Sequence, residues 1–301
     1  MSSLSTCVRS FVPNPTSIPH FIPSPPSTPS HELSLEFDST LVDVFQSAVA
    51  SGKKLLEIGG PTPNLRALYG LLGPAGMDNV VRDPQDGYES RGAEINHQCK
   101  EGTEEETCEV DSFPYTFDGV TYGRTYLQDA TSLPLFSDST YSFIMSSHNL
   151  EHYLDPIAAV KAWDRVLVEG GGIFVVVPEP ENMYDDWREK TKFIDLVKRH
   201  EAFRDNRTDK IDFAKMKFEE DILKHTNFER QNPDDPKSAE ESMRALPEER
   251  KDWVDKLHWS VFDFATLESV FLCLGYDVLG MDLLYPYHMM FIARKPVQYI
   301  I

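Results

Sequence analysis

The chain has few cysteines and no long apolar run. Its four cysteines, Cys7, Cys99, Cys108 and Cys273, are scattered over 301 residues and form no tight C-x-x-C pair. This scatter argues against a disulfide framework and favours a reducing compartment. His97 lies near Cys99 in an acidic stretch, but the spacing is not that of a zinc site, and no metal site is expected. No stretch approaches the roughly 18 apolar residues of a membrane span, so no membrane partner is expected.

Basic residues are also scarce. The 29 lysines and arginines are outnumbered by 49 aspartates and glutamates, which gives a formal net charge of -20. A nucleic-acid-binding protein usually presents a basic face that neutralises phosphates. We therefore expect no nucleic-acid partner; a small molecule or a basic protein suits the charge better. The sequence does not indicate an oligomeric state.

Acidic residues are absent from residues 1–31, which hold seven prolines and eight serines. Proline at this density prevents a packed core, so a disordered tail is predicted. The lack of acids also fits an organellar transit peptide, although Arg9 is the single basic residue of the stretch. We favour a plain tail on a cytoplasmic protein, with the transit peptide as the open alternative. Residues 32–301 are expected to form one large domain.

Apolar runs and turn residues then alternate as in an α/β protein. Helices are predicted at 39–50, 64–72, 155–167 and 264–274, and strands at 55–58, 79–83, 141–147, 173–178, 276–284 and 288–295. A hairpin around Asp118-Gly119 is predicted within 114–130. Since strand and helix alternate up to residue 177, the sheet should be mostly parallel, with helices on both faces and a final antiparallel pair.

Turn residues mark three further boundaries. Thr62 is expected to cap the helix that begins at Pro63, and Gly170, Gly171 and Gly172 to end the helix before them. Residues 180–257 are highly charged and read as a helical insertion after the fifth strand. In open α/β sheets ligands bind beyond the carboxyl ends of the strands. The insertion follows a strand at this edge, which suggests a lid over the bound ligand, with three residues near the mouth of the pocket: Tyr184, Asp185 and Trp187.

Glycine is sparse where a dinucleotide turn would need it. The first strand runs into Gly59 and Gly60, whose missing Cβ atoms allow close approach to the backbone. Asp83, at the end of the second strand, could bind both hydroxyls of a ribose, which both NAD and S-adenosylmethionine contain. The turn lacks the further glycines of a pyrophosphate site, which disfavours NAD. Asp129 ends a third strand, where its carboxylate could accept a hydrogen bond from an adenine amino group.

A family resemblance follows from two segments. "LLEIGG" and "YLQDATSLPLFSDSTYSFIMSSHNLEHYLDPIAAVKAWDRVLVEGGGIFVVVP" resemble the first motif and the central block of the class I S-adenosylmethionine-dependent methyltransferases, type 11 group. The resemblance covers about residues 40–178 and 258–296. It implies an α/β, Rossmann-like, doubly wound and mostly parallel seven-stranded sheet, with a C-terminal antiparallel strand. The implied cofactor is S-adenosyl-L-methionine, and the implied activity is methyl transfer to a small-molecule substrate.

The resemblance also implies roles for single residues. Gly59 and Gly60 would back the methionine part of the cofactor, with Glu57 holding the loop. Asp83 would bind the ribose, and Asp129 and Ala130 the adenine. Ser147 and His148 would lie between cofactor and acceptor. Each acidic residue has a structural alternative: Glu57 could brace a neighbouring loop, Asp83 could cap a turn, and Asp129 could shape the turn before Pro134.

His148 is the candidate base for an oxygen or nitrogen acceptor. Its alternative is a structural role, with Glu151 and His152 tying the loop to the helix. His258 and Tyr287 are weaker site candidates.

The sequence departs from the family at two places. Pro61 stands where glycine is common, and Glu179 and Asp186 stand where related bacterial chains carry histidines. A methyltransferase-shaped binding protein without catalysis therefore stays an alternative, as does, less favoured, an NAD-dependent oxidoreductase.

Overall fold

The structure is a computed structural model that describes residues 35–72, 76–82, 112–182, 185, 188–217, 258–284 and 287–297. Several predicted features lie outside these residues: the tail 1–31, the acidic stretch with His97, Cys99 and Cys108, the ribose candidate Asp83, the residues Tyr184, Asp186 and Trp187, and the insertion beyond residue 217.

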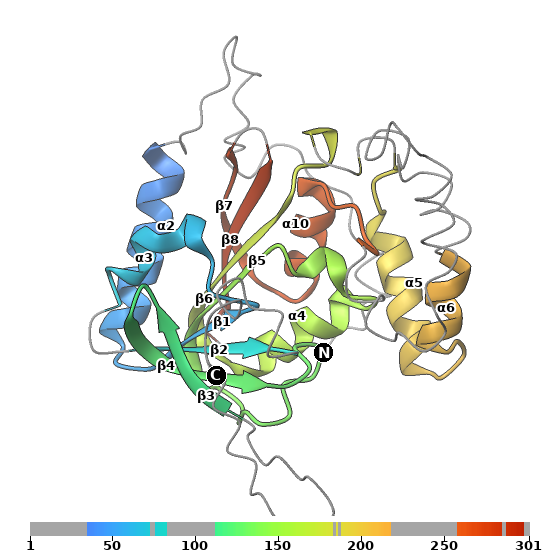
Figure 1. Cartoon of the computed structure of the whole chain (residues 1–301). Helices are drawn as coiled ribbons and strands as arrows, with labels where there is room; N and C mark the ends of the chain where they lie inside the picture. The colour runs from blue at the N-terminus through green and yellow to red at the C-terminus, as the bar shows by residue number, and fades with distance from the viewer. Residues whose placement is uncertain are drawn as a thin grey trace, which may run out of the picture.

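One mixed sheet organises the domain (Figure 1). Its strands are β1 (Leu55–Ile58), β2 (Met77–Val81), β3 (Ser112–Phe117), β4 (Val120–Leu127), β5 (Tyr141–Ser147), β6 (Leu167–Pro178), β7 (Asp277–Leu284) and β8 (His288–Arg294). They lie in the order β3-β4-β2-β1-β5-β6-β8-β7. The five strands β4, β2, β1, β5 and β6 are parallel to one another, while β8 is antiparallel to both β6 and β7. The predicted Rossmann-like fold class is confirmed.

Within the described residues the sheet has eight strands, where seven were predicted. The additional strand is β3, which pairs antiparallel with β4 through the turn at Asp118 and Gly119. Both turn residues have positive φ, 50° and 75°, as a two-residue hairpin turn requires. The hairpin was predicted; because its first arm also joins the sheet edge, the strand count rises by one.

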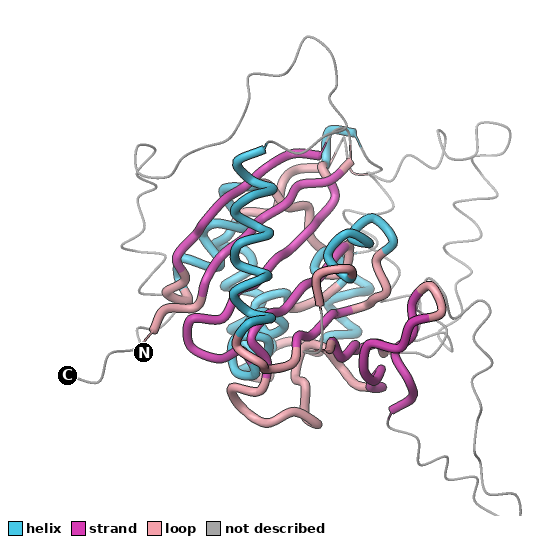
Figure 2. The backbone as a smooth tube through the Cα atoms, turned by 90° about the vertical axis from the view of Figure 1, so that its left-hand side faces the viewer, coloured by secondary structure: helices cyan, strands magenta, loops and turns pink. Residues whose placement is uncertain are grey.

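Helices cover both faces of the sheet. One face is covered by α2 (Leu35–Ala50), the long cyan helix that crosses the strands in Figure 2, together with the short η1 (Pro63–Leu65) and α3 (Arg66–Tyr69). The other face is covered by α4 (Pro156–Val166) and α10 (Phe264–Cys273). Beyond them lie α5 (Phe193–Arg204) and α6 (Lys210–Lys217), as Figure 1 shows.

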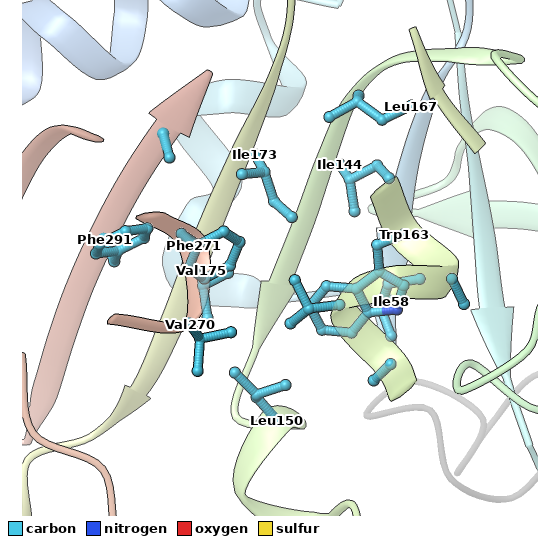
Figure 3. Packing of buried hydrophobic residues seen from close by; sticks show 14 of the residues in the cluster. Ile58, Ile144, Leu150, Trp163, Leu167, Ile173, Val175, Val270, Phe271 and Phe291 are labelled. Atoms are coloured by element: carbon cyan, nitrogen blue, oxygen red, sulfur yellow. The ribbon is translucent and has the colours of Figure 1, made fainter. Parts of the chain in front are cut away.

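Successive side chains of a strand point to opposite faces of the sheet, so the core is divided into two layers. Leu55 of β1 packs in the layer under α2, and Leu56 and Ile58 pack in the layer under α4 and α10. Figure 3 shows this second layer, in which the buried indole of Trp163 lies against the sheet. The Trp163 indole N–H donates to the carbonyl of Ala130 at 3.0 Å, which fixes the segment after β4.

Two boundary predictions are wrong. Helix α4 ends at Val166, and the three glycines 170–172 lie inside β6. Gly172 is needed there because a Cβ would lie 2.5 Å from Val44 Cγ1. Thr62 does not cap the helix with its side chain, because its hydroxyl donates to Glu57.

The described part of the insertion is helical. Helix α5 packs against α4 and α10, and its Arg199 donates to the carbonyl of Trp259 and the hydroxyl of Ser260. The lid function stays a prediction. None of the described helices is long and apolar enough to cross a bilayer.

The carboxyl ends of the parallel strands meet at one edge of the sheet. Ile58, Val81, Leu127, Ser147 and Pro178 are the last residues of β1, β2, β4, β5 and β6. Since β8 runs the opposite way, its first residue, His288, pairs with Pro178 at this same edge. The edge is where ligands bind in open α/β sheets.

Candidate functional site: the carboxyl edge of the sheet

The turn after β1 is held by the protein's own groups. Gly59 N–H donates to the carbonyl of Val80 at 2.8 Å. Gly60 N–H donates to Asn79 Oδ1, and Asn79 Nδ2 donates back to the Gly60 carbonyl, both at 3.0 Å. Thr62 N–H donates to the hydroxyl of Tyr69 at 3.1 Å. Because positions 61 and 63 are prolines, no N–H group of residues 59–63 is left to bind a phosphate.

The two glycines of the turn make room for side chains of the protein. At Gly59, where φ is 75°, a Cβ would lie 2.1 Å from Asn149 Oδ1. At Gly60 it would lie 2.2 Å from the carboxyl carbon of Glu57. Such separations are far inside van der Waals contact, so alanine fits at neither position. The space beside these two glycines is therefore occupied, at least in part, by side chains of the protein itself.

Glu57 is fully buried and lies in a cluster of hydroxyl groups. Thr62 Oγ1 donates to Oε1 at 2.7 Å, and the hydroxyls of Tyr69 and Tyr115 both donate to Oε2. Burial raises the pKa of Glu57 above its usual range, although the hydroxyl donors oppose this shift. Thr62 belongs to the turn, so its bond ties Glu57 to this loop; that the loop holds a cofactor stays a prediction.

Asn149 joins the turn to the loop after β5. Its Nδ2 donates to the carbonyl of Ile58 at 2.8 Å and to that of Ser147 at 2.7 Å. The ends of β1 and β5 are thereby held together. Gly59, Ser147 and His148 are half-buried beside this link, so part of each stays open to a ligand.

Asp129 and Ala130 follow β4 at the same edge, and only one of them is exposed. Asp129 Oδ1 accepts from both the N–H and the hydroxyl of Thr131 at 2.8 Å, which makes the local turn that the structural alternative foresaw. The Asp129 side chain is nevertheless exposed, whereas Ala130 is buried under Trp163. Asp129 can therefore still present its carboxylate to a ligand.

His148 forms a pair with a histidine that the sequence did not indicate. His148 Nε2 lies 2.7 Å from His288 Nδ1, and His148 Nδ1 lies 3.5 Å from Glu151 Oε1. The backbone of His148 has a φ of 53°, an uncommon value for a residue with a side chain, and its N–H donates to Val176. Burial and the neighbouring His148 lower the pKa of His288 to about 4, so the His288 imidazole is neutral at pH 7.

Glu151 is buried among imidazoles. Its carboxylate lies near the rings of His148, His152 and His258. Burial alone would raise the pKa of Glu151, but these three rings hold it below its usual range. His258, predicted as a weaker candidate, lies in this group, while Tyr287 is half exposed near His288.

Residues 93–175 match the family model described as a methyltransferase domain. The chain carries a methyltransferase domain. The match includes Asp129, Ala130, Ser147 and His148 and begins after the glycine turn. The predicted enzyme class, a methyltransferase, is confirmed.

Solved structures give more distant likenesses. The trans-methyltransferase CalH, in complex with S-adenosylhomocysteine, is 14% identical with a TM-score of 0.42, over 83% of this chain and 54% of CalH. This chain therefore spans about half the length of CalH. A SAM-dependent methyltransferase from Aquifex aeolicus is 9% identical with a TM-score of 0.42, over 81% and 82%. A SAM-dependent methyltransferase from Methanosarcina mazei is 13% identical with a TM-score of 0.38, over 82% and 93%. No curated protein matches the sequence. These likenesses are too distant to transfer residue roles.

We expect Gly59→Ala to destabilise the protein more than Gly52→Ala. Both glycines have left-handed φ, 75° and 71°, so both substitutions cost about 1–2 kcal/mol of backbone strain. Only at position 59 does the new methyl group collide with another residue, Asn149, which adds about 1–3 kcal/mol. Urea unfolding followed by circular dichroism measures the difference. Equal losses in the two variants would show that Asn149 does not hold the turn.

Proposed function

We propose that this protein transfers the methyl group of S-adenosylmethionine to an oxygen or nitrogen atom of a small molecule. The observation that carries the proposal is the His148–His288 pair, which lies next to Ser147 at the carboxyl edge. A base is needed only where the acceptor must lose a proton, and a neutral imidazole provides one near pH 7. A thiolate acceptor would need no such base.

The turn supports a cofactor without a phosphate. Its N–H groups are bonded within the protein, so they offer no donor for a pyrophosphate, which argues against NAD. In the proposed arrangement Gly59 and Ser147 contact the methionine part of S-adenosylmethionine, Asp129 the adenine and Asp83 the ribose. Glu57 and Gly60 act indirectly, by shaping the turn.

The cofactor supplies a methyl group that is activated by its bond to a sulfonium. The protein's part is to hold the acceptor atom in line with that bond, since positioning alone lowers a barrier by about 7–11 kcal/mol. A bound cofactor would give up the methyl carbon to the acceptor atom, and its sulfur would keep the electron pair of the carbon–sulfur bond. The proton of the acceptor passes to the His148–His288 pair, in which the hydrogen bond between His148 Nε2 and His288 Nδ1 can relay it from one ring to the other.

The first test is calorimetric titration with S-adenosylmethionine, S-adenosylhomocysteine and NAD. We expect the first two to bind and NAD not to bind. Asp129→Ala should weaken binding at least about tenfold, because it removes a charged hydrogen-bond acceptor. Thr131→Val is the matched control: it removes the hydroxyl bond to Asp129 but keeps the carboxylate. Binding of NAD alone would favour the oxidoreductase, and no binding at all would favour the inactive protein.

The second test concerns the base. Release of S-adenosylhomocysteine is measured across a set of small alcohols, phenols and amines, and the best acceptor is kept. His148→Gln should then lower kcat by about 10²–10⁴-fold and leave the affinity for S-adenosylmethionine unchanged. His200→Gln, which removes a buried histidine of α5 that pairs with Asp155 and not with His148 or His288, is the control. If kcat were unaffected in His148→Gln, His148 would not be the base.

A further inference from the structure

The imidazoles around Glu151 include a group with the composition of a metal site. Glu151, His152 and His258 each offer one ligand atom, and these three atoms lie within 4.8 Å of one another. Glu151 Oε1 and His152 Nε2 are 3.8 Å apart, and the rings of His152 and His258 meet edge to face at 4.7 Å. Glu151 and His152 come from η3 (Leu150–His152), whereas His258 comes from the segment before α10, more than a hundred residues further along the chain.

The carboxylate at the centre of this group is not satisfied by hydrogen bonds. Glu151 is 1% exposed, and among the residues that the structure describes neither of its carboxylate oxygens has a hydrogen-bond partner. The nearby imidazole nitrogens of His148 and His152, at 3.5 and 3.8 Å, are too distant for good hydrogen bonds. A buried carboxylate without a partner is costly, and coordination of a cation is one of the two ways in which proteins satisfy it.

A second carboxylate orients one of the two histidines. Asp185 Oδ2 lies 2.6 Å from His258 Nδ1, and Asp185 Oδ1 accepts from Arg188 at 2.8 Å. Asp185 is buried, so the contact is protected from water. Because Nδ1 of His258 is bound to this carboxylate, Nε2 is the atom that can bind a metal. Metal-binding histidines commonly have their other ring nitrogen bonded to a carboxylate in this way.

The backbone holds the two halves of the group together. The N–H groups of Trp259 and Ser260 donate to the carbonyl of Glu151, the first at 2.8 Å. Arg199 of α5 binds the other side of this segment through the Trp259 carbonyl and the Ser260 hydroxyl. His258 is therefore fixed beside Glu151 by contacts that do not depend on a metal, and the ligand set is largely preformed.

We propose that Glu151, His152 and His258 bind a divalent transition-metal ion, with zinc as the reference ion. Two imidazoles and one carboxylate form a donor set found in zinc and non-haem iron proteins, where further positions stay open for water or substrate. Zinc ligands about 2.0–2.2 Å from the ion lie about 3.3–3.6 Å apart in a tetrahedron, so binding requires a small contraction of the group. The proposal contradicts the expectation that the chain has no metal site. It does not depend on the proposed methyl transfer.

The test is a zinc titration of the full chain after treatment with a chelator and without S-adenosylmethionine. Calorimetry should give one tight site per chain, and Co²⁺ in place of Zn²⁺ should give the visible absorption bands of a histidine-bound ion. His258→Asn and Glu151→Gln should abolish this site. Asp185→Asn, which keeps the shape of the side chain, should weaken it by about ten- to a hundredfold.

His200→Asn is the matched control, because His200 also pairs with a buried carboxylate: its Nδ1 lies 2.9 Å from Asp155 Oδ2. This variant should bind zinc as the wild type does. Circular dichroism identifies any variant that fails to fold. The zinc titrations of the folded variants among His258→Asn, Glu151→Gln and Asp185→Asn then test the proposal. Absence of a tight site in the wild type, or a site unchanged in these variants, would overturn the proposal and leave a metal-free cluster of imidazoles around Glu151.

Discussion

The hydrogen bonds between Asn79 and Gly60 determine how the rest of the edge is arranged. One amide side chain satisfies both the N–H and the carbonyl of Gly60, so the turn after β1 is held to β2. Asn149 then holds the other side of the turn to the loop after β5. The polar groups of the turn are paired inside the protein. A ligand can therefore pack against the turn, but the turn has no free N–H donors for a phosphate. The turn is therefore compatible with S-adenosylmethionine, which has no phosphate, and disfavours dinucleotides, whose pyrophosphate needs such donors.

Two buried glutamates show how the surroundings of a carboxylate set its charge. Glu57 lies among neutral hydroxyls, and burial raises its pKa. Glu151 is equally buried, but it lies among imidazoles, which together lower its pKa in spite of burial. Glu57 consequently suits a bracing role in the turn. Glu151 is an anion whose hydrogen-bonding capacity is unused among the described residues, and a cation can use it.

The sequence predicted those features that depend on local patterns. The apolar run of β1, the hairpin turn at Asp118 and Gly119 and the final antiparallel pair were found because periodicity and turn chemistry are local. The prediction that glycines 170–172 end a helix was wrong. Gly172 is required because it packs against Val44 of α2, and not because a helix ends there. Thr62 has the residue type of a cap, but the buried carboxylate of Glu57 competes for its hydroxyl.

The candidate site was predicted only in part, for a physical reason. Ser147 and His148 follow a recognisable strand, and their place at the edge could be deduced. His288 and His258 come from more than a hundred residues further along the chain and reach His148 and Glu151 only through the antiparallel register of β8 and the backbone bonds of Trp259. Asn79 sits inside an ordinary strand sequence, and no local signal marks it as the residue that holds Gly60.

A crystal structure with bound S-adenosylhomocysteine would test the central claim most directly. The account predicts the ligand along the carboxyl ends of β1, β4 and β5, beside Gly59, Asp129 and Ser147. It also predicts that Gly60 N–H stays bonded to Asn79 and Thr62 N–H to Tyr69. The account would be contradicted if the ligand lay elsewhere, or if the turn opened so that these two N–H groups bound the ligand.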